Sequence, residues 1–377
     1  MTEVAEQSRN EGADEPVIAI GPRSRAATHF ALLDALRGVA AMIVCYGHAI
    51  DVHALHGIFP SFPLAVDFFF VLSGFVIALS YEARLIDRQM GFGRFAVIRL
   101  VRLYPLIFLS VVLGACVLCL RIVANREWHL VAALLLTVPF SLLVIPTPFL
   151  AQSGALGLQL YWPLNPPIWS LFFEIIANLV YAAAVRTLSN RLIAVILAAS
   201  GVCYLAIALT FHTVAFGNDW DWPAGFIRVA YSFLAGVATY RVYAAQQLAW
   251  LRRLPSLAII ISLLICLSAG YLAIELIIVI FIFPILVLAG AYSLVPGSIR
   301  NLCLWLGTVS YPLYLLHFPL LRVWERVIIR SSSLSDSGIY MTEIGFLAFA
   351  MAFSALILKF YDIPVRRTLA KLVLNRS

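Results

Sequence analysis

Charged residues are scarce in this sequence, and their scarcity excludes most soluble proteins. Asp, Glu, Lys and Arg make up 12% of its 377 residues, whereas a typical soluble domain contains roughly 25%. Hydrophobic residues account for 63% of the chain, and the mean hydropathy is +0.96. So little polar surface cannot cover a water-soluble globule of this size. We therefore predict an integral membrane protein.

The sequence also has few cysteines and none of the common cofactor motifs. Its six cysteines all lie in apolar stretches. Cys116 and Cys119 form a CxxC pair, but inside a hydrophobic run, where cysteine usually acts as a small apolar residue. There is no P-loop and no Rossmann fingerprint. We therefore predict no disulfide framework, no metal site and no bound cofactor.

The first 28 residues lack the apolar core of a signal peptide. They are polar and carry five acidic residues, a composition that does not support a packed core. We expect 1–28 to be a disordered cytosolic tail. Arg23 and Arg25, just before the first apolar segment, should hold this end inside the cell.

Basic residues outnumber acidic ones and give a formal net charge of +7. They lie mostly in short loops between apolar segments, as the positive-inside rule expects of cytosolic loops. This distribution explains the charge without a nucleic-acid partner, and no nucleic-acid-binding motif is present. We therefore predict a protein of the cell inner (plasma) membrane that contacts lipid and no nucleic acid.

Eleven apolar segments come close to the length of about 20 residues that a transmembrane helix requires. They are 30–50, 62–81, 101–121, 128–145, 168–186, 191–212, 225–242, 254–269, 271–292, 302–321 and 340–360. The predicted fold class is all-α, a polytopic bundle of transmembrane helices over 29–361. A short basic cytosolic tail, 362–377, follows it.

The basic loops decide how the spans are counted. Loop 82–102 and the C-terminal end are both rich in arginine and favour the cytosol, so the stretch between about 122 and 165 should cross an even number of times. Prolines from Pro139 to Pro167 break helices here. We therefore interpret 128–148 as a re-entrant or interfacial hairpin and predict about ten spans with both termini cytosolic. The alternative is twelve, with 144–162 as a second weak span.

Ionisable residues inside an apolar span are costly, so they mark candidate functional sites. The first span contains Asp34, Arg37 and His48. From Arg37 to His48 the helix returns to within roughly 20° of the same face and rises about 16 Å. Asp34 lies on the same stripe and can pair with Arg37. The structural alternative is a buried Asp34–Arg37 pair with His48 at the outer interface.

Two further polar groups lie near the starts of the third and fifth spans. Arg99 and Arg102 are spaced to share a helix face, and guanidinium groups suit phosphate oxygens. The alternative is anchoring at the cytosolic interface by snorkelling. A polar stripe with helical spacing lies in the fifth span, formed by Ser170, Glu174, Asn178 and Tyr181. The alternative for this stripe is hydrogen bonding between helices.

The second and tenth spans carry fewer polar residues. Asp67 lies in the second span, and Ser73 follows it beside Gly74. The alternative for Ser73 and Gly74 is close helix packing. His317 lies near the end of the tenth span and suits a structural role as well as a catalytic one.

Five segments together resemble the membrane-bound acyltransferase 3 family. They are LDALRG with His48 ten intervening residues after Arg37, FFFVLSGFVI, RLVRLYP, PPIWSLFFE and SYPLYLLH. They occur in the family's order between about residues 30 and 360. The resemblance implies transfer of an acyl group, usually acetyl, from acyl-CoA to a hydroxyl. The acceptor that it implies is a carbohydrate or glycolipid, such as lipopolysaccharide or exopolysaccharide.

The resemblance also implies roles for the polar residues. We expect His48, Arg37 and Glu174 to be catalytic, and Arg99 and Arg102 to bind the phosphates of acyl-CoA. Histidine suits the deprotonation of a hydroxyl near neutral pH, and it can also carry an acyl group covalently. The supporting residues are Asp34, Asp67, Ser73, Trp169, Ser170, Tyr311 and His317.

Two other classes of function are open from the sequence. A transporter also carries ionisable residues inside its spans, although no inverted repeat or pair of broken helices is visible here. A non-catalytic assembly or export partner would tolerate substitution of Arg37 and His48.

Overall fold

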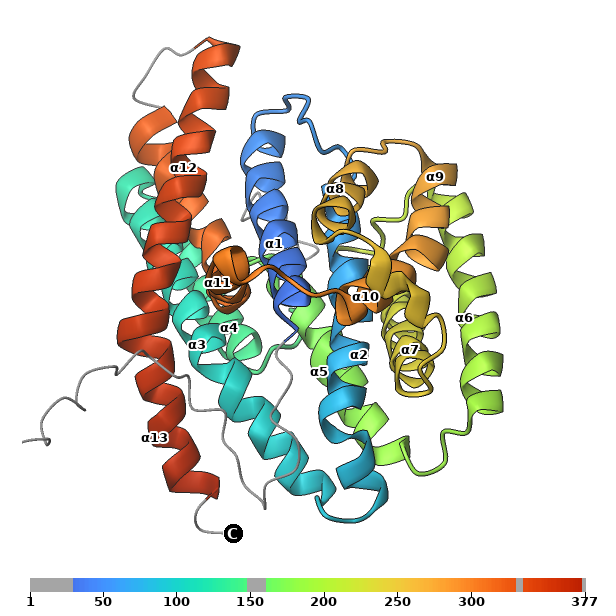
Figure 1. Cartoon of the computed structure of the whole chain (residues 1–377). Helices are drawn as coiled ribbons and strands as arrows, with labels where there is room; N and C mark the ends of the chain where they lie inside the picture. The colour runs from blue at the N-terminus through green and yellow to red at the C-terminus, as the bar shows by residue number, and fades with distance from the viewer. Residues whose placement is uncertain (1–29, 148–160, 330–334, 375–377) are drawn as a thin grey trace, which may run out of the picture. The chain divides into compact units, whose positions relative to one another are not determined.

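The computed structural model describes residues 30–147, 161–329 and 335–374. Every regular element within these ranges is helical, as predicted (Figure 1). The α-helices are α1 (Ala31–Asp51), α2 (Ala65–Ile86), α3 (Phe92–Asn125), α4 (Val131–Leu142), α5 (Ile168–Ala184), α6 (Asn190–Phe211), α7 (Gly225–Ala244), α8 (Ser256–Leu267), α9 (Leu272–Ile277), α10 (Phe283–Tyr292), α11 (Gly297–Trp324), α12 (Asp336–Ile357) and α13 (Ile363–Leu374). The predicted tail 1–28 lies outside the described residues.

Several helical segments are long and apolar enough to cross a membrane. Seven qualify, namely Ala31–Asp51, Phe62–Ile86, Phe92–Asn125, Asn190–Phe211, Leu272–Tyr292, Gly297–Ile328 and Asp336–Val373. The shorter apolar helices are Trp128–Leu142, Ile168–Ala184 and Ser256–Leu267. Helix α7 coincides with the predicted span 225–242 but is not among the seven, and it carries Arg228 and Arg241. This pattern suggests a multi-pass membrane protein, as predicted from the composition.

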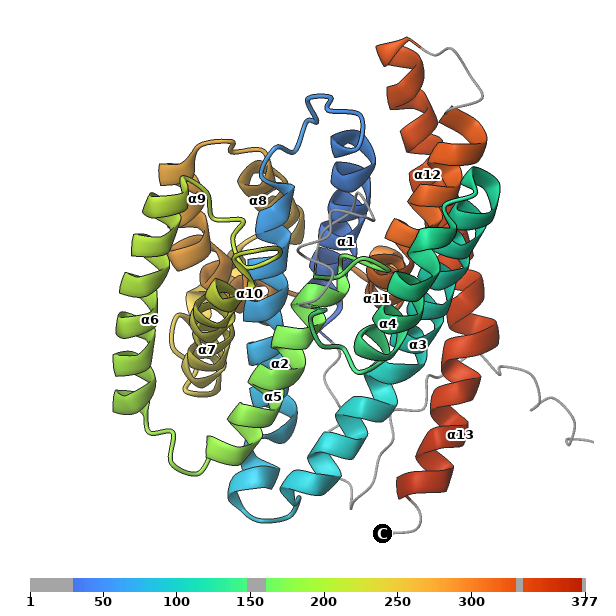
Figure 2. The same ribbon diagram turned by 180° about the vertical axis from the view of Figure 1, so that it is seen from behind.

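The segment predicted as a hairpin, 128–148, contains one short helix in its described part. Helix α4 follows a 3-10 turn (Trp128–Leu130) and ends at Leu142, shortly after Pro139. Its 12 residues extend about 18 Å, which is too short for a hydrocarbon core of about 30 Å. Helix α5 is also short and begins near the mid-height of the bundle (Figure 2). Most of the alternative span 144–162 lies outside the described residues.

Three π-helical turns join or extend α-helices without ending the helical path. They are Ile278–Ile282 between α9 and α10, Glu325–Ile329 after α11, and Leu358–Asp362 between α12 and α13. Such turns are uncommon and frequently lie at functional sites. The last of these turns joins α12 to α13, so the basic tail predicted at 362–377 is helical from Ile363 to Leu374 and continues the path of α12.

Glycines let two pairs of helices approach closely. Helix α1 packs along α11, and a Cβ at Gly307 would overlap the side chain of Asp34, while one at Gly38 would lie within 3 Å of the α11 backbone. Gly74 and Gly236 allow the same close approach between α2 and α7, because a Cβ at either position would overlap the backbone of the other helix. The alternative that assigned Gly74 to close helix packing is thus confirmed. Helix α1 also contacts α2, α8, α10 and α12, so the first predicted span lies at the centre of the bundle.

Candidate active site

The polar stripe of α1 faces α11, and the two helices run in the same direction. Asp34 and Arg37 lie against the early part of α11, around Gly307 and Ser310. His48 lies further along α1, against His317 further along α11. The stripe predicted on α1 therefore forms one side of an interface, and α11 supplies the other.

Arg37 is held by three groups at once. Its Nη2 donates to Oδ1 of Asp34 at 2.8 Å and to the backbone oxygen of Gly307 at 2.7 Å, and its Nε donates to Oγ of Ser310 at 3.0 Å. The pairing of Asp34 with Arg37, expected from their spacing, is confirmed. The Arg37 side chain keeps 27% of its surface exposed, so the guanidinium is fixed in direction but still accessible.

His48 forms a hydrogen-bonded pair with His317. Nδ1 of His48 lies 3.1 Å from Nε2 of His317, and the rings stack with an interplanar angle of 24°. Phe62 and Phe318 present their edges to the His48 ring at 5.1 and 5.7 Å between centroids. The rings thus enclose His48 on several sides and limit its rotation.

The surrounding acceptors assign the tautomers of this pair. Nδ1 of His317 lies 3.1 Å from the backbone oxygen of Leu313, and a carbonyl oxygen only accepts, so this nitrogen carries the proton. In the neutral ring Nε2 of His317 is then the acceptor for Nδ1–H of His48. The remaining nitrogen of a neutral His48, Nε2, therefore holds a lone pair and can accept a proton.

Arg37 and His48 do not form a single cluster. Their rise along α1 is about 16 Å, and each is bound by a different part of α11. At this distance the guanidinium group of Arg37 cannot stabilise charge on an atom that reacts at His48. Arg37 and His48 therefore make two separate polar contacts along the interface of α1 and α11.

Helices α2, α3 and α5 meet around Glu174. Its Oε1 accepts from Oγ of Ser73 at 2.9 Å and from Nη2 of Arg99 at 3.3 Å. Arg99 is only 8% exposed, whereas Arg102 is exposed on the same helix. The two arginines were predicted to share a face, and the structure assigns them different surroundings, one inside the bundle and one at its surface.

Beside Arg99 lie polar atoms without a partner. Nε of Arg99 and both side-chain amide atoms of Asn178 are buried and make no hydrogen bond. Both residues line a small cavity of about 10 Å³ between α3 and α5. Buried polar groups that lack partners are rare in folded proteins and call for an explanation. A cavity of this volume holds about one water molecule, so these groups are candidates for hydrogen bonding to a water molecule or to a small polar group of a ligand.

Asp67 is bound to a residue that sequence reasoning missed. Arg228 on α7 donates from Nη2 to Oδ2 of Asp67 at 2.7 Å, and the exposed fractions of the two side chains are 1% and 0%. Ser232 also donates to Asp67, at 3.1 Å. The sequence could have identified Arg228 as a candidate, because it is an ionisable residue inside the predicted span 225–242. Asp67 is thus part of a buried ion pair, which favours a structural role over an orienting role at the active site.

The remaining predicted residues connect α5 and α11 to their neighbours. Ser170 and Tyr314 share a hydrogen bond of 2.8 Å, and Tyr314 was not predicted as a site residue. The indole of Trp169 lies 5.3 Å from the guanidinium carbon of Arg228. Tyr311 donates to the backbone oxygen of Leu103 at 2.9 Å. The hydrogen bonds of Tyr314 and Tyr311 position α11, which carries His317, against the helices that carry Glu174 and Arg99.

Comparison with known proteins identifies the family to which the sequence is similar. The family model Acyl_transf_3, described as an acyltransferase domain, matches residues 30–359. The chain is also similar to a protein of Rhizobium radiobacter named "Protein 2 in picA locus", with 36% identity over 192 residues. That similarity covers 48% of this chain and 96% of the relative. No solved structure matches the chain.

Proposed function

We propose that this chain, which belongs to the acyltransferase 3 family, is an integral membrane O-acyltransferase. Family membership suggests acyltransferase activity, and the candidate spans support a membrane setting. The donor is acyl-CoA, most simply acetyl-CoA, and the acceptor is a hydroxyl of a carbohydrate or glycolipid. The observation that carries the proposal is the His48–His317 pair, because it leaves one nitrogen of His48 available as a base.

In the proposed reaction His48 is a general base. Its Nε2 takes the proton of the acceptor hydroxyl while the hydroxyl oxygen attacks the thioester carbonyl. The tetrahedral intermediate collapses, the carbon–sulfur bond breaks, and the thiolate of CoA leaves with the proton from His48. The products are the acyl ester and free CoA. His317 accepts from Nδ1–H throughout and stabilises the imidazolium that forms on His48.

The same lone pair allows a covalent route. His48 would then attack the thioester, release CoA and pass the acyl group to the acceptor in a second step. This route predicts that acetyl-CoA alone releases about one CoA per chain and leaves an acetyl group on His48. The general-base route predicts no release before the acceptor is added. Mass spectrometry of the chain after incubation with acetyl-CoA alone distinguishes the two.

Positive charge along α3 suits the anionic donor. Arg102 is exposed and would meet the phosphates of CoA first, because guanidinium groups bind phosphate oxygens well. Arg99 and Asn178 offer unpartnered groups further inside. Arg37 lies between these residues and His48 along the proposed path. Arg37 is too far from His48 to act on the thioester. Its proposed role is to hold the flexible arm of acyl-CoA in position.

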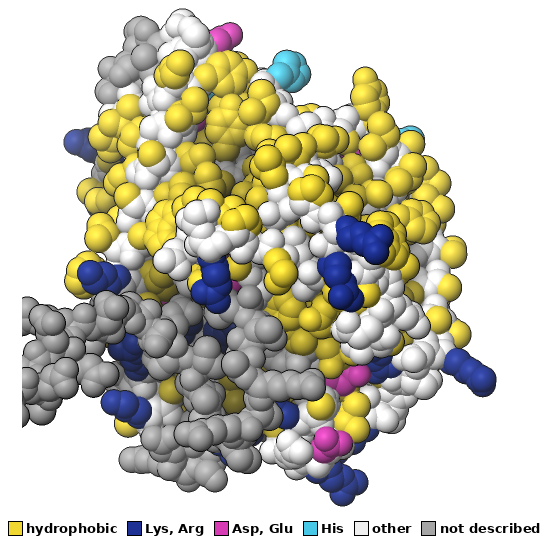
Figure 3. All heavy atoms as spheres, in the orientation of Figure 1, with side chains coloured by type: hydrophobic (Ala, Val, Ile, Leu, Met, Phe, Trp, Pro, Cys, Tyr) yellow, Lys and Arg dark blue, Asp and Glu magenta, His cyan; other side chains and the backbone are white. Residues whose placement is uncertain are grey.

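The proposed topology has about ten spans with both termini in the cytosol. The seven candidate spans, together with α5, α7 and α8, would make up this number. The face shown in Figure 3 carries most of its visible Lys and Arg in the lower half and hydrophobic side chains across the upper half. Basic loops favour the cytosol, so we assign the end where α2 meets α3 to that side. The proposed location is the inner (plasma) membrane, and His48 then lies toward the outer leaflet.

The experiment that tests the function uses the purified chain in lipid nanodiscs with labelled acetyl-CoA and extracted envelope glycans. We expect a stable acetyl ester on a glycan with the wild-type chain and with His56→Ala, since the His56 side chain is exposed. His48→Ala should lose about 100-fold or more in rate. An unchanged rate in His48→Ala would overturn the mechanism. In sealed vesicles, label that crosses the membrane without covalent transfer would support a transporter instead.

A further inference from the structure

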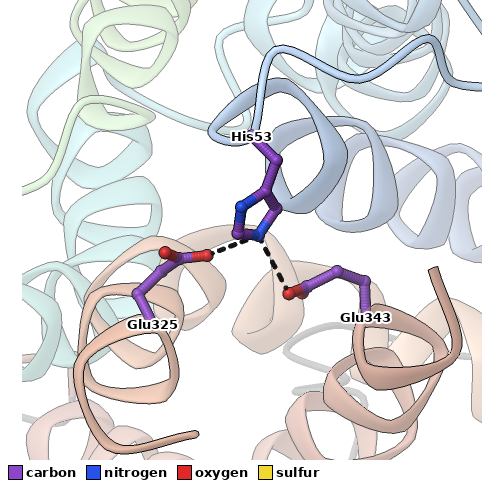
Figure 4. Close-up of side chains that lie close together, drawn as sticks. All are labelled: His53, Glu325 and Glu343. Carbon is purple, nitrogen blue, oxygen red and sulfur yellow. Dashed lines mark hydrogen bonds and ion pairs between the residues drawn. The ribbon is translucent and has the colours of Figure 1, made fainter. Parts of the chain in front are cut away.

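A second polar cluster lies outside the proposed active site. It consists of His53, just after α1, Glu325, at the start of the π-helical turn after α11, and Glu343 on α12 (Figure 4). Nε2 of His53 lies 2.8 Å from Oε1 of Glu325 and 3.3 Å from Oε1 of Glu343. One ligand atom from each residue lies within 4.8 Å of the others. The end of α1 thus converges on one point with the π-helical turn after α11 and with α12.

This cluster contains a buried carboxyl group that is only partly hydrogen-bonded. Glu343 is 0% exposed, and its Oε2 has no hydrogen-bond partner. A buried carboxylate is strongly unfavourable unless it is paired or binds a metal. The unpartnered oxygen of Glu343 therefore indicates an additional positively charged ligand at this point.

The donor set and its spacing fit a transition-metal ion. A tetrahedral Zn²⁺ holds nitrogen and carboxylate ligands at about 2.1 Å, which places neighbouring ligand atoms about 3.4 Å apart. The distance from His53 to Glu343 already has this value to within about 0.1 Å, and Glu325 would have to withdraw by about half an ångström. The imidazole ligand favours Zn²⁺ over Mg²⁺ or Ca²⁺, which prefer oxygen ligands. The π-helical turn that begins at Glu325 is a kind of distortion that is frequent at functional sites.

We propose that His53, Glu325 and Glu343 bind one divalent transition-metal ion, with Zn²⁺ as the best fit. The ion would clamp the end of α1 to α11 and α12, because it takes ligands from all three segments. His53 follows His48 by five residues, so the clamp would hold the part of α1 that carries the proposed base. The proposal departs from the sequence-based prediction that the chain has no metal site. It is independent of the acyl transfer itself, since no step of that reaction uses the ion.

The test measures Zn²⁺ on the purified, chelator-stripped full chain in nanodiscs. We expect about one Zn²⁺ per chain by elemental analysis and a higher thermal unfolding midpoint when Zn²⁺ is added. His53→Gln and Glu343→Gln should each weaken Zn²⁺ binding by at least about 10-fold in competition with a chromophoric chelator. His56→Gln is the matched control, because it removes a nearby exposed histidine side chain.

Each result either supports or overturns the site. A wild-type chain that holds no Zn²⁺ at micromolar concentration would overturn it, as would equal affinity in His53→Gln and His56→Gln. If Glu343→Gln does not fold, Glu325→Gln replaces it, since the Glu325 side chain is 18% exposed and a substitution there is easier to accommodate than one at the fully buried Glu343. The readout is metal binding and not acyl transfer, so its outcome is separate from that of the proposed function.

Discussion

Nδ1 of His48 lies 3.1 Å from Nε2 of His317, although 268 residues stand between them in the chain. The contact joins two parallel helices at the centre of the bundle. The direction of this hydrogen bond is fixed, because Nδ1–H of His317 donates to the carbonyl oxygen of Leu313 and leaves Nε2 of His317 as the acceptor. In the proposed mechanism, His317 thereby prepares His48 to act as a base.

The first prediction concerns His317. His317→Ala should lower kcat by about 100-fold, because Nδ1–H of His48 loses its acceptor and the ring its orientation. The KM for acetyl-CoA should change little, since His317 is buried and lies at the far end of the path from Arg102. Steady-state kinetics with varied acetyl-CoA measure both values.

A conservative variant separates orientation from packing at this position. His317→Gln keeps a side-chain oxygen that can accept from His48 and an amide that can donate to Leu313. It should therefore recover at least part of the rate that His317→Ala loses. Equal rates in the two variants, with both chains folded, would mean that the hydrogen bond does not contribute to catalysis.

The second prediction concerns Arg99 and the donor. Arg99→Ala should raise the KM for acetyl-CoA by about 10-fold to 100-fold, the loss expected for hydrogen bonds to a charged group. The KM for the acceptor should not move. Arg94→Ala, on the same helix but without the contact to Glu174, is the control. An acetyl-CoA dependence that is the same in Arg99→Ala and Arg94→Ala would leave Arg99 as a structural partner of Glu174 only.

The third prediction concerns the close approach of α1 and α11. Gly307→Ala would drive a methyl group into Asp34, so the helices must separate or Asp34 must release Arg37. We expect a loss of about 1–3 kcal/mol in stability and a clear fall in activity. Gly345→Ala in α12 is the control, since its added methyl group meets its nearest neighbour, Trp324, at 3.9 Å. Thermal unfolding in detergent compares them, and equal midpoints would contradict the packing argument.

Sequence patterns predicted what lies within one helix better than what lies between helices. The pairing of Asp34 with Arg37 follows from a spacing of three residues, and it is present. His48 and His317 were both named, but their contact was not predicted, because a stripe of polar residues does not specify which helix faces it. The same reason explains why Glu174 and Arg99 were assigned to separate groups. Arg228, His53 and Glu343 were overlooked although Arg228 and Glu343 lie inside predicted spans.

The last prediction tests whether Asp67 is structural. Arg228→Gln leaves the carboxylate of Asp67 buried without its guanidinium partner, and the loss of one member of such a pair costs about 3–5 kcal/mol. Asp67→Asn likewise leaves the guanidinium group of Arg228 buried without its carboxylate partner. The double variant with both changes removes both charges and keeps polar groups that can bond to each other. It should be more stable than Arg228→Gln alone, with a coupling energy of about 1–3 kcal/mol.

Activity of the double variant then decides the role of Asp67. If the pair only holds α2 against α7, the folded double variant should acylate at close to the wild-type rate, because neither side chain reaches the His48–His317 pair by any hydrogen bond among the described residues. A double variant that unfolds at the wild-type temperature yet has lost its activity would place Asp67 in the catalytic machinery. The thermal midpoint and the rate must be measured on the same preparation, because a partly unfolded sample would imitate the catalytic result.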